Sequence, residues 1–206
     1  MVNAEAKRIF QFLPNEAIFQ PSFRAPAMKN LAGMLILGVL NGYYARGAGN
    51  LSDQTVLVVD DDAEMQNFLR DVLISQGFSV HTVGTGRDAL SEAFALKPDL
   101  ILLDLIMSTM DGVAVCKALR TNEKTQHTPI LVVTGSLSNK QIEESMTSGA
   151  DDFISKPVDV QDMLVRVRAL LKCRDIVDPI DRLSRYVETV REMSDELAHR
   201  AHSASE

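Results

Sequence analysis

The chain has 206 residues, 46% hydrophobic and 24% charged, a composition typical of a globular protein with one ordinary domain and sizeable extensions. Its formal net charge is −7, but residues 1–52 hold five basic and two acidic side chains, a net +3, which leaves −10 for the rest. Direct nucleic-acid binding is therefore not expected, because phosphate backbones select positively charged surfaces and the main part of this chain is acidic.

The two cysteines, Cys116 and Cys173, are too few for a disulfide framework. This count predicts a reducing environment and a cytoplasmic location. The four histidines show no metal-ligand spacing with cysteine or acidic residues, so they predict no metal site.

Residues 1–52 differ in character from the rest of the chain. They contain an apolar cluster at 9–13, several prolines, a mostly apolar run at 31–40 and a Gly-rich end. The apolar run is too short to span a bilayer, and its faint likeness to a signal peptide begins well inside the chain. We expect an N-terminal helical extension and linker that packs on a partner or on the main domain, without membrane contact.

Between Gln54 and about Arg174, apolar runs alternate five times with amphipathic segments. The predicted strands are 55–59, 79–83, 99–103, 129–133 and 151–155; the predicted helices are 63–76, 86–96, 111–121, 138–148 and 158–173. Short apolar runs between helices are typical of buried strands in a parallel sheet, and right-handed crossovers place helices on both faces. The sequence therefore predicts an α/β fold, a five-stranded doubly wound parallel sheet, over residues 53–174.

Residues 175–206 predict one further helix. Asp178 is a good N-cap and Pro179 suits the first helical turn. Apolar residues then recur mostly at steps of three and four: Ile176, Ile180, Leu183, Val187, Val190 and Leu197. This spacing favours a coiled-coil-like helix that forms a homodimer, with packing of the same stripe on its own domain as the alternative.

Polar residues end four of the predicted strands. Asp60 and Asp61 follow the first strand and Asp104 the third, while Thr134 and Lys156 follow the fourth and fifth. Strand C-termini share one edge of a parallel sheet, which is where open α/β folds bind ligands. Crowded carboxylates need a neutralising cation, and Mg²⁺ suits a site with few carboxylates and a phosphate. A carboxylate there could accept a phosphoryl group.

Two other acids carry a simpler interpretation. Asp62 and Asp111 stand where helices should begin, so we expect them to cap those helices.

Residues 54–174 resemble the receiver domain of two-component response regulators, which has a flavodoxin-like fold. The matching segments are Val56–Asp61, Asp104–Gly112, Pro129–Thr134 and Gly149–Pro157. The separations of 30 residues from Asp104 to Thr134 and 52 to Lys156 also resemble that family. The resemblance does not cover either end of the chain.

The resemblance implies a phosphorylation site with a magnesium cofactor. Asp104 would be the phosphoacceptor, supplied by a sensor histidine kinase or a histidine phosphotransfer protein. Asp60 and Asp61 would position Mg²⁺, together with Asp104 and the backbone carbonyl of Ile106.

It also implies a conformational switch. Thr134 would move toward the phosphoryl group, Phe153 would turn inward with it, and Lys156, preceding a cis peptide bond to Pro157, would bind a phosphoryl oxygen. The added anion would bias a bistable surface.

Three positions depart from the family pattern. Ser108 replaces a usual proline, which should loosen the loop after Asp104, and Gly135 replaces a more usual alanine. Ile106 flanks the water that hydrolyses the phosphoryl group. We hypothesise that this apolar side chain cannot orient the water, so that the phosphoprotein is long-lived.

The sequence thus predicts a response regulator that signals through its terminal helices or a partner. A receiver-fold scaffold that mediates protein–protein interaction without phosphorylation is the alternative. An enzyme is not expected, since a dehalogenase-like phosphatase would need a second acid where Ile106 stands. No output-domain motif appears before Glu206, so a stand-alone regulator and a fragment of a longer one both remain open.

Overall fold

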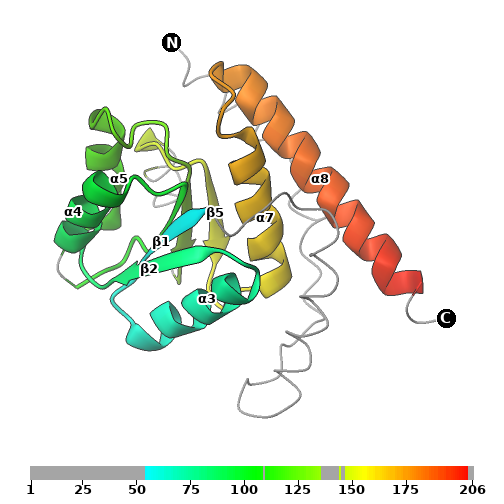
Figure 1. Ribbon diagram of the computed structural model, residues 1–206, viewed down its shortest axis with the longest axis horizontal. Helices are drawn as coiled ribbons and strands as arrows, with labels where there is room; N and C mark the ends of the chain where they lie inside the picture. Colours follow the sequence, from blue (N-terminus) through cyan, green and yellow to red (C-terminus); the bar gives the residue numbers. More distant parts are fainter. Residues whose placement is uncertain (1–53, 109, 136–143, 145–146, 204–206) are drawn as a thin grey trace. The chain divides into compact units, whose positions relative to one another are not determined.

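The computed structural model describes residues 54–108, 110–135, 144 and 147–203 (Figure 1). The extension expected at 1–52 and most of the helix expected at 138–148 lie outside these residues. The described part contains a five-stranded parallel sheet in the order β2-β1-β3-β4-β5. Its strands are β1 Thr55–Val59, β2 Ser79–Val83, β3 Leu100–Leu103, β4 Ile130–Thr134 and β5 Asp152–Ser155. The predicted fold class is confirmed.

Three strands begin one residue later than the sequence predicts, and for two of them acidic residues give the reason. Asp99 precedes β3, and its carboxylate accepts a hydrogen bond from the Thr55 backbone N–H at 2.7 Å. Asp151 precedes β5 and accepts from the Ile130 N–H at 2.8 Å. These side chains bond the first backbone N–H groups of neighbouring strands, so the acids mark the positions at which β3 and β5 begin.

The helices in the described residues are α3 Ala63–Ser75, α4 Gly86–Leu96, α5 Gly112–Thr121, α7 Val160–Cys173 and α8 Pro179–Ser203. Side-chain N-caps begin α3, α4, α5 and α7: Asp62, Thr85, Asp111 and Asp159 each accept a hydrogen bond from a backbone N–H of the first turn. The predicted capping roles of Asp62 and Asp111 are therefore confirmed. The cap at Asp159 also explains why α7 begins at Val160 and not at residue 158.

The core has two layers, one on each face of the sheet. Val56 and Val58 of β1 pack with α3 and α7, while Leu57 and Val59 pack with α4 and α5. Figure 1 shows the same division of the helices. Because both faces are covered, β1, β3 and β4 are apolar at nearly every position and show no alternation of polar and apolar residues.

The last helix, α8, runs back along α7 (Figure 1). Tyr186 and Thr189 are buried against the domain, 7% and 2% exposed. Val187 and Val190 pack on the same core layer as α7. In contrast, Ile180 from the predicted apolar stripe is 54% exposed. The first half of α8 thus packs on its own domain, which is the alternative interpretation of the stripe; homodimer formation stays a prediction.

Within the described residues, every helix is either too short or too polar to cross a bilayer.

Candidate functional site

The carboxyl edge of the sheet brings together groups from distant parts of the sequence. Asp60 follows β1, Asp104 follows β3 and Lys156 follows β5. The Lys156 ammonium donates to Asp60 Oδ2 at 2.7 Å and to Asp104 Oδ2 at 2.6 Å. One cation therefore links two nearly buried carboxylates, whose side chains are 2% and 6% exposed.

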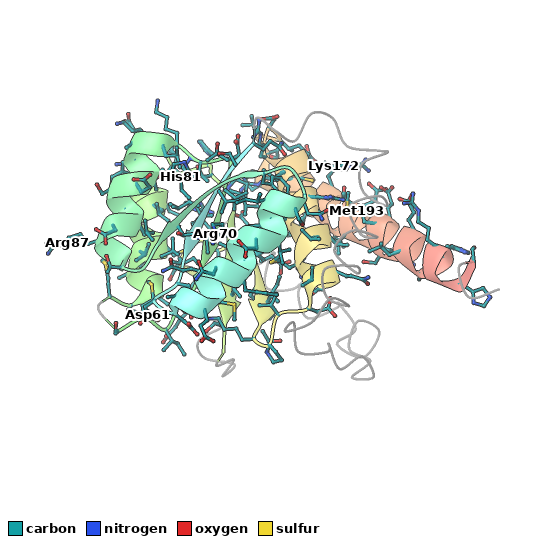
Figure 2. All side chains as sticks on the ribbon, turned by 60° about the horizontal axis from the view of Figure 1, so that its bottom comes forward. Asp61, Arg70, His81, Arg87, Lys172 and Met193 are labelled. Atoms are coloured by element: carbon teal, nitrogen blue, oxygen red, sulfur yellow. The ribbon has the colours of Figure 1, made fainter. Side chains whose placement is uncertain are left out.

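A third acid completes a cluster that could hold a metal ion. Asp60, Asp61 and Asp104 each offer one carboxylate oxygen, and these oxygens lie within 4.8 Å of one another. Asp61 lies just before α3 (Figure 2) and is exposed, whereas Asp60 and Asp104 are buried. A set of oxygen donors with one exposed member suits a hard cation such as Mg²⁺, which keeps several of its waters.

The electrostatics of the edge follow from burial and from Lys156. Burial raises the pKa of Asp60, although the hydrogen bond from Lys156 opposes the shift. Desolvation favours a lower pKa for Lys156, but its hydrogen bonds to Asp104 and Asp60 and their charges raise it overall. The lysine therefore stays protonated and supplies a fixed positive charge at the edge.

Backbone groups hold the two buried carboxylates in place. The Asp62 N–H donates to Asp60 Oδ1 at 3.0 Å, and the Ile106 N–H donates to Asp104 Oδ1 at 2.9 Å. Each carboxylate thus has one oxygen on a loop amide and the other on Lys156. Ile106 itself is 50% exposed beside the site.

The loop after β3 also depends on a close approach of backbones. A Cβ on Gly112 would lie 2.4 Å from the Asp104 carbonyl oxygen and 2.5 Å from Leu105 Cα. Only glycine permits this packing, which brings the start of α5 against the residue that carries the carboxylate.

The sequence does not predict two contacts that support the cluster. The Gln66 side-chain amide donates to the Asp60 backbone carbonyl at 2.6 Å. The Ser108 backbone N–H donates to Asp61 Oδ2 at 2.7 Å, and hydrogen bonds from Ser108 lower the pKa of Asp61. Neither contact has a local sequence signal, since one crosses a loop and the other joins residues 47 positions apart.

Thr134 and Phe153 lie on neighbouring strands beside this cluster. Thr134, the last residue of β4, is fully buried, and its hydroxyl has no hydrogen-bond partner among the described residues. A buried hydroxyl without a partner is rare and calls for an explanation, such as an incoming group that it could bond. Phe153 of β5 is half-buried against the α4–α5 core layer, and the Lys156–Pro157 peptide bond is cis.

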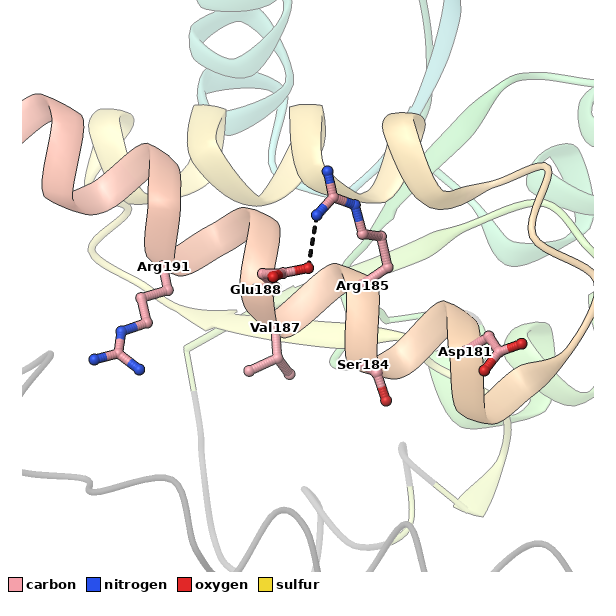
Figure 3. Close-up of a pocket in the computed structure, with 6 residues that line it drawn as sticks. All are labelled: Asp181, Ser184, Arg185, Val187, Glu188 and Arg191. Carbon is pink, nitrogen blue, oxygen red and sulfur yellow. Dashed lines mark hydrogen bonds and ion pairs between the residues drawn. The ribbon is translucent and has the colours of Figure 1, made fainter.

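A hollow on α8 lies apart from this chemistry. It has a volume of about 570 Å³, and all six of its lining residues belong to α8: Asp181, Ser184, Arg185, Val187, Glu188 and Arg191 (Figure 3). Arg185 and Glu188 form an exposed ion pair at 2.6 Å. The functional groups of the sheet edge are absent from this lining, so the hollow is not the candidate site.

Together, the fold and the edge define a doubly wound α/β domain with an acidic, lysine-bridged site. A family model described as the response regulator receiver domain matches residues 56–168. The chain therefore belongs to the response regulator receiver domain family. Receiver domains of this family are phosphorylated by sensor kinases in two-component systems and generally bind Mg²⁺ at their acidic site.

Relatives among curated proteins are longer response regulators. The DNA-binding response regulator MtrA of Mycobacterium leprae is 39% identical over 131 residues, 64% of this chain and 56% of that protein. The DNA-binding dual master transcriptional regulator RpaA of Synechocystis is 38% identical over 120 residues, 58% of this chain and 50% of that protein. The chain thus spans about half the length of these relatives. DNA binding is said of those proteins, and the expected lack of it in this chain stays a prediction.

Solved structures show the same domain. The chemotaxis response regulator CheY4 of Vibrio cholerae superposes with a TM-score of 0.54 at 30% identity, covering 57% of this chain and 98% of that one. A two-component response regulator from Clostridium difficile gives a TM-score of 0.55 at 28% identity, covering 58% and 97%. The likeness is to a receiver domain and leaves both ends of this chain unmatched.

Proposed function

We propose that this chain is a phosphorylation-controlled switch that accepts a phosphoryl group on Asp104 and is not itself an enzyme. The observation that carries this proposal is the bridge from Lys156 to Asp60 and Asp104 at the carboxyl edge of the sheet. The donor would be a phosphohistidine on a sensor histidine kinase or a histidine phosphotransfer protein. The proposed receiver comprises residues 53–174, with 1–52 and 175–206 as terminal extensions.

The residues of the edge fit a magnesium ion. Asp60, Asp61 and Asp104 would hold it with the Ile106 carbonyl, since three carboxylate oxygens already lie within 4.8 Å of one another. When bound, Mg²⁺ supplies positive charge to the equatorial oxygens of the phosphoryl group during transfer.

The chain's own residues account for the remaining requirements of the transfer. A carboxylate oxygen of Asp104 attacks phosphorus, the P–N bond to the donor histidine breaks, and the histidine leaves with its electron pair. Lys156, already bonded to Asp104, is placed to bond a phosphoryl oxygen and offset the new charge. The unpartnered Thr134 hydroxyl is available to donate to another oxygen, and Phe153 would turn inward with it.

The route outward from the site would be β5. Lys156 directly follows this four-residue strand, and Asp152 begins it. Asp152 is bonded to Tyr186 of α8 and to Arg166 of α7. A shift of β5 on phosphorylation would therefore act on the contact that holds α8, which makes α8 the proposed signalling element. A cytoplasmic location accords with two buried, reduced cysteines.

The test is intact mass after incubation with acetyl phosphate and Mg²⁺, with Asp104→Asn as the matched control. We expect one phosphoryl adduct on the parent chain and none on the variant. Hydrogen exchange on the same samples should show changed protection of α8 in the phosphorylated parent chain and unchanged protection in Asp104→Asn. If no Mg²⁺ concentration gives an adduct, the phosphoacceptor proposal is wrong and the receiver fold would act as a scaffold.

A further inference from the structure

The exposed acid of the cluster, Asp61, is held by a loop from a different part of the chain. Its Oδ2 accepts a hydrogen bond from the Ser108 backbone N–H at 2.7 Å. Asp61 lies between β1 and α3, whereas Ser108 lies between β3 and α5, 47 residues away. The bond therefore ties together the two loops that carry the cluster's three carboxylates.

This bond matters because the Asp61 side chain is exposed, whereas Lys156 and the burial of the site hold the other two carboxylates in place. Asp60 and Asp104 are nearly buried and are each held by a loop amide and by Lys156. Asp61 is exposed, and an exposed carboxylate that binds a cation must first give up rotamer freedom. A hydrogen bond to one oxygen limits that freedom in advance and leaves the other oxygen for the cation.

We infer that Ser108 is a positioning residue for the metal site: its backbone N–H preorganises Asp61 and so strengthens Mg²⁺ binding. Partners that orient metal ligands commonly change metal affinity by about 10- to 100-fold when removed. The low end of this range applies here, because the bond is exposed to solvent and competes with water. This inference rests on the proposed function, since it assigns a role within the proposed magnesium site.

Two substitutions of Ser108 test its role, because only one of them removes the backbone N–H. Proline has no backbone N–H, so Ser108→Pro removes the donor. Ser108→Ala keeps the N–H and removes only the hydroxyl. The two variants thus separate the backbone contribution from the side-chain contribution. Ser108 donates a backbone bond that the usual proline could not donate, and the expected loosening of this loop stays a prediction.

The experiment measures the Kd for Mg²⁺ of the full chain by isothermal titration calorimetry, since the sequence has no tryptophan to report binding. We expect Ser108→Pro to weaken binding about tenfold and Ser108→Ala to weaken it less. Equal affinity of Ser108→Pro and the parent would overturn the inference while leaving the proposed function intact. A parent chain that binds no Mg²⁺ would overturn both.

A second measurement guards against a proline variant that distorts the loop. Amide hydrogen exchange at Ser108, measured by NMR without Mg²⁺, should be slower in the parent than in Asp61→Ala, which keeps the loop sequence unchanged. Equal exchange rates at this amide would show that the bond does not persist in solution, and the inference would be abandoned.

Discussion

The contact between α8 and the receiver depends on a buried hydroxyl, and its removal gives the sharpest prediction. Tyr186 donates from its hydroxyl to the Asp152 carboxylate, which also pairs with the Arg166 guanidinium. The side chain of Asp152 is 4% exposed, so water cannot replace a lost donor freely. Tyr186→Phe keeps the ring and its packing but leaves a carboxylate lone pair without its partner.

The expected loss follows from the charge and burial of the acceptor. Hydrogen bonds to charged groups contribute about 1.5–3 kcal/mol to stability. Removing the donor from a buried acceptor is especially destabilising, because water does not replace the lost bond. Arg166 remains to compensate the charge of Asp152, so we expect Tyr186→Phe to lower the free energy that holds α8 on the domain by about 2 kcal/mol. If α8 undocks before the domain unfolds, that loss increases the undocked population roughly 30-fold.

The assay combines chemical denaturation with hydrogen exchange of α8. Tyr186→Phe should speed exchange in α8 more than in β1 or β3, because only the helix loses its anchor. Glu188→Gln on the same helix is the matched control: it removes only an exposed ion pair to Arg185 and should change neither measurement. Unchanged denaturation midpoint and unchanged α8 protection in Tyr186→Phe would refute the reasoning.

The same contact predicts a pH dependence. Burial raises the pKa of Tyr186 well above 10.0, and the Asp152 charge adds to the shift. Above about pH 10 the unfolded chain loses the tyrosine proton while the folded chain keeps it, so stability falls as pH rises through this window. Tyr186→Phe lacks this group, so the stability difference between parent and variant should shrink in that range.

Two further predictions concern the loops of the site. Gly112→Ala should destabilise the domain by about 1–3 kcal/mol, because its Cβ would meet backbone atoms at 2.4 and 2.5 Å, whereas Gly135→Ala, with nothing within 4 Å, should cost far less. Urea denaturation of both variants checks this, and equal stabilities would contradict it. Ile106→Asn should shorten the lifetime of the phosphorylated chain, because a polar side chain can orient the attacking water. Decay of the adduct followed by mass measures this lifetime, and an unchanged value would rule out the hydrolysis hypothesis.

The sequence is most informative where a pattern repeats locally. Continuous apolar runs predict buried parallel strands, because a strand covered on both faces has no polar side. The structure confirms all five strands to within one residue. The order of polar residues after successive strands also predicts the groups of the sheet edge, since parallel strands end at the same edge. The structure brings Asp60, Asp104 and Lys156 into hydrogen-bond contact there.

The contacts that support the acidic cluster cannot be predicted from local sequence patterns, because the positions of the loops depend on the whole fold. No local pattern relates Ser108 to Asp61 or Gln66 to the Asp60 carbonyl. A backbone N–H is common to almost every residue, so its use at one position becomes visible only when the two loops are seen side by side.

The C-terminal helix α8 shows both what the sequence determines and what only the tertiary structure decides. Its start and its amphipathic character were determined by the sequence alone, through the Asp178-Pro179 start and the apolar spacing. Which face is covered, and by what, was decided by tertiary structure: Tyr186 and Thr189 turn inward while Ile180 stays exposed. The physical reason is that periodicity measures how apolar a face is, whereas the docked face also had to supply a donor to the buried Asp152 carboxylate.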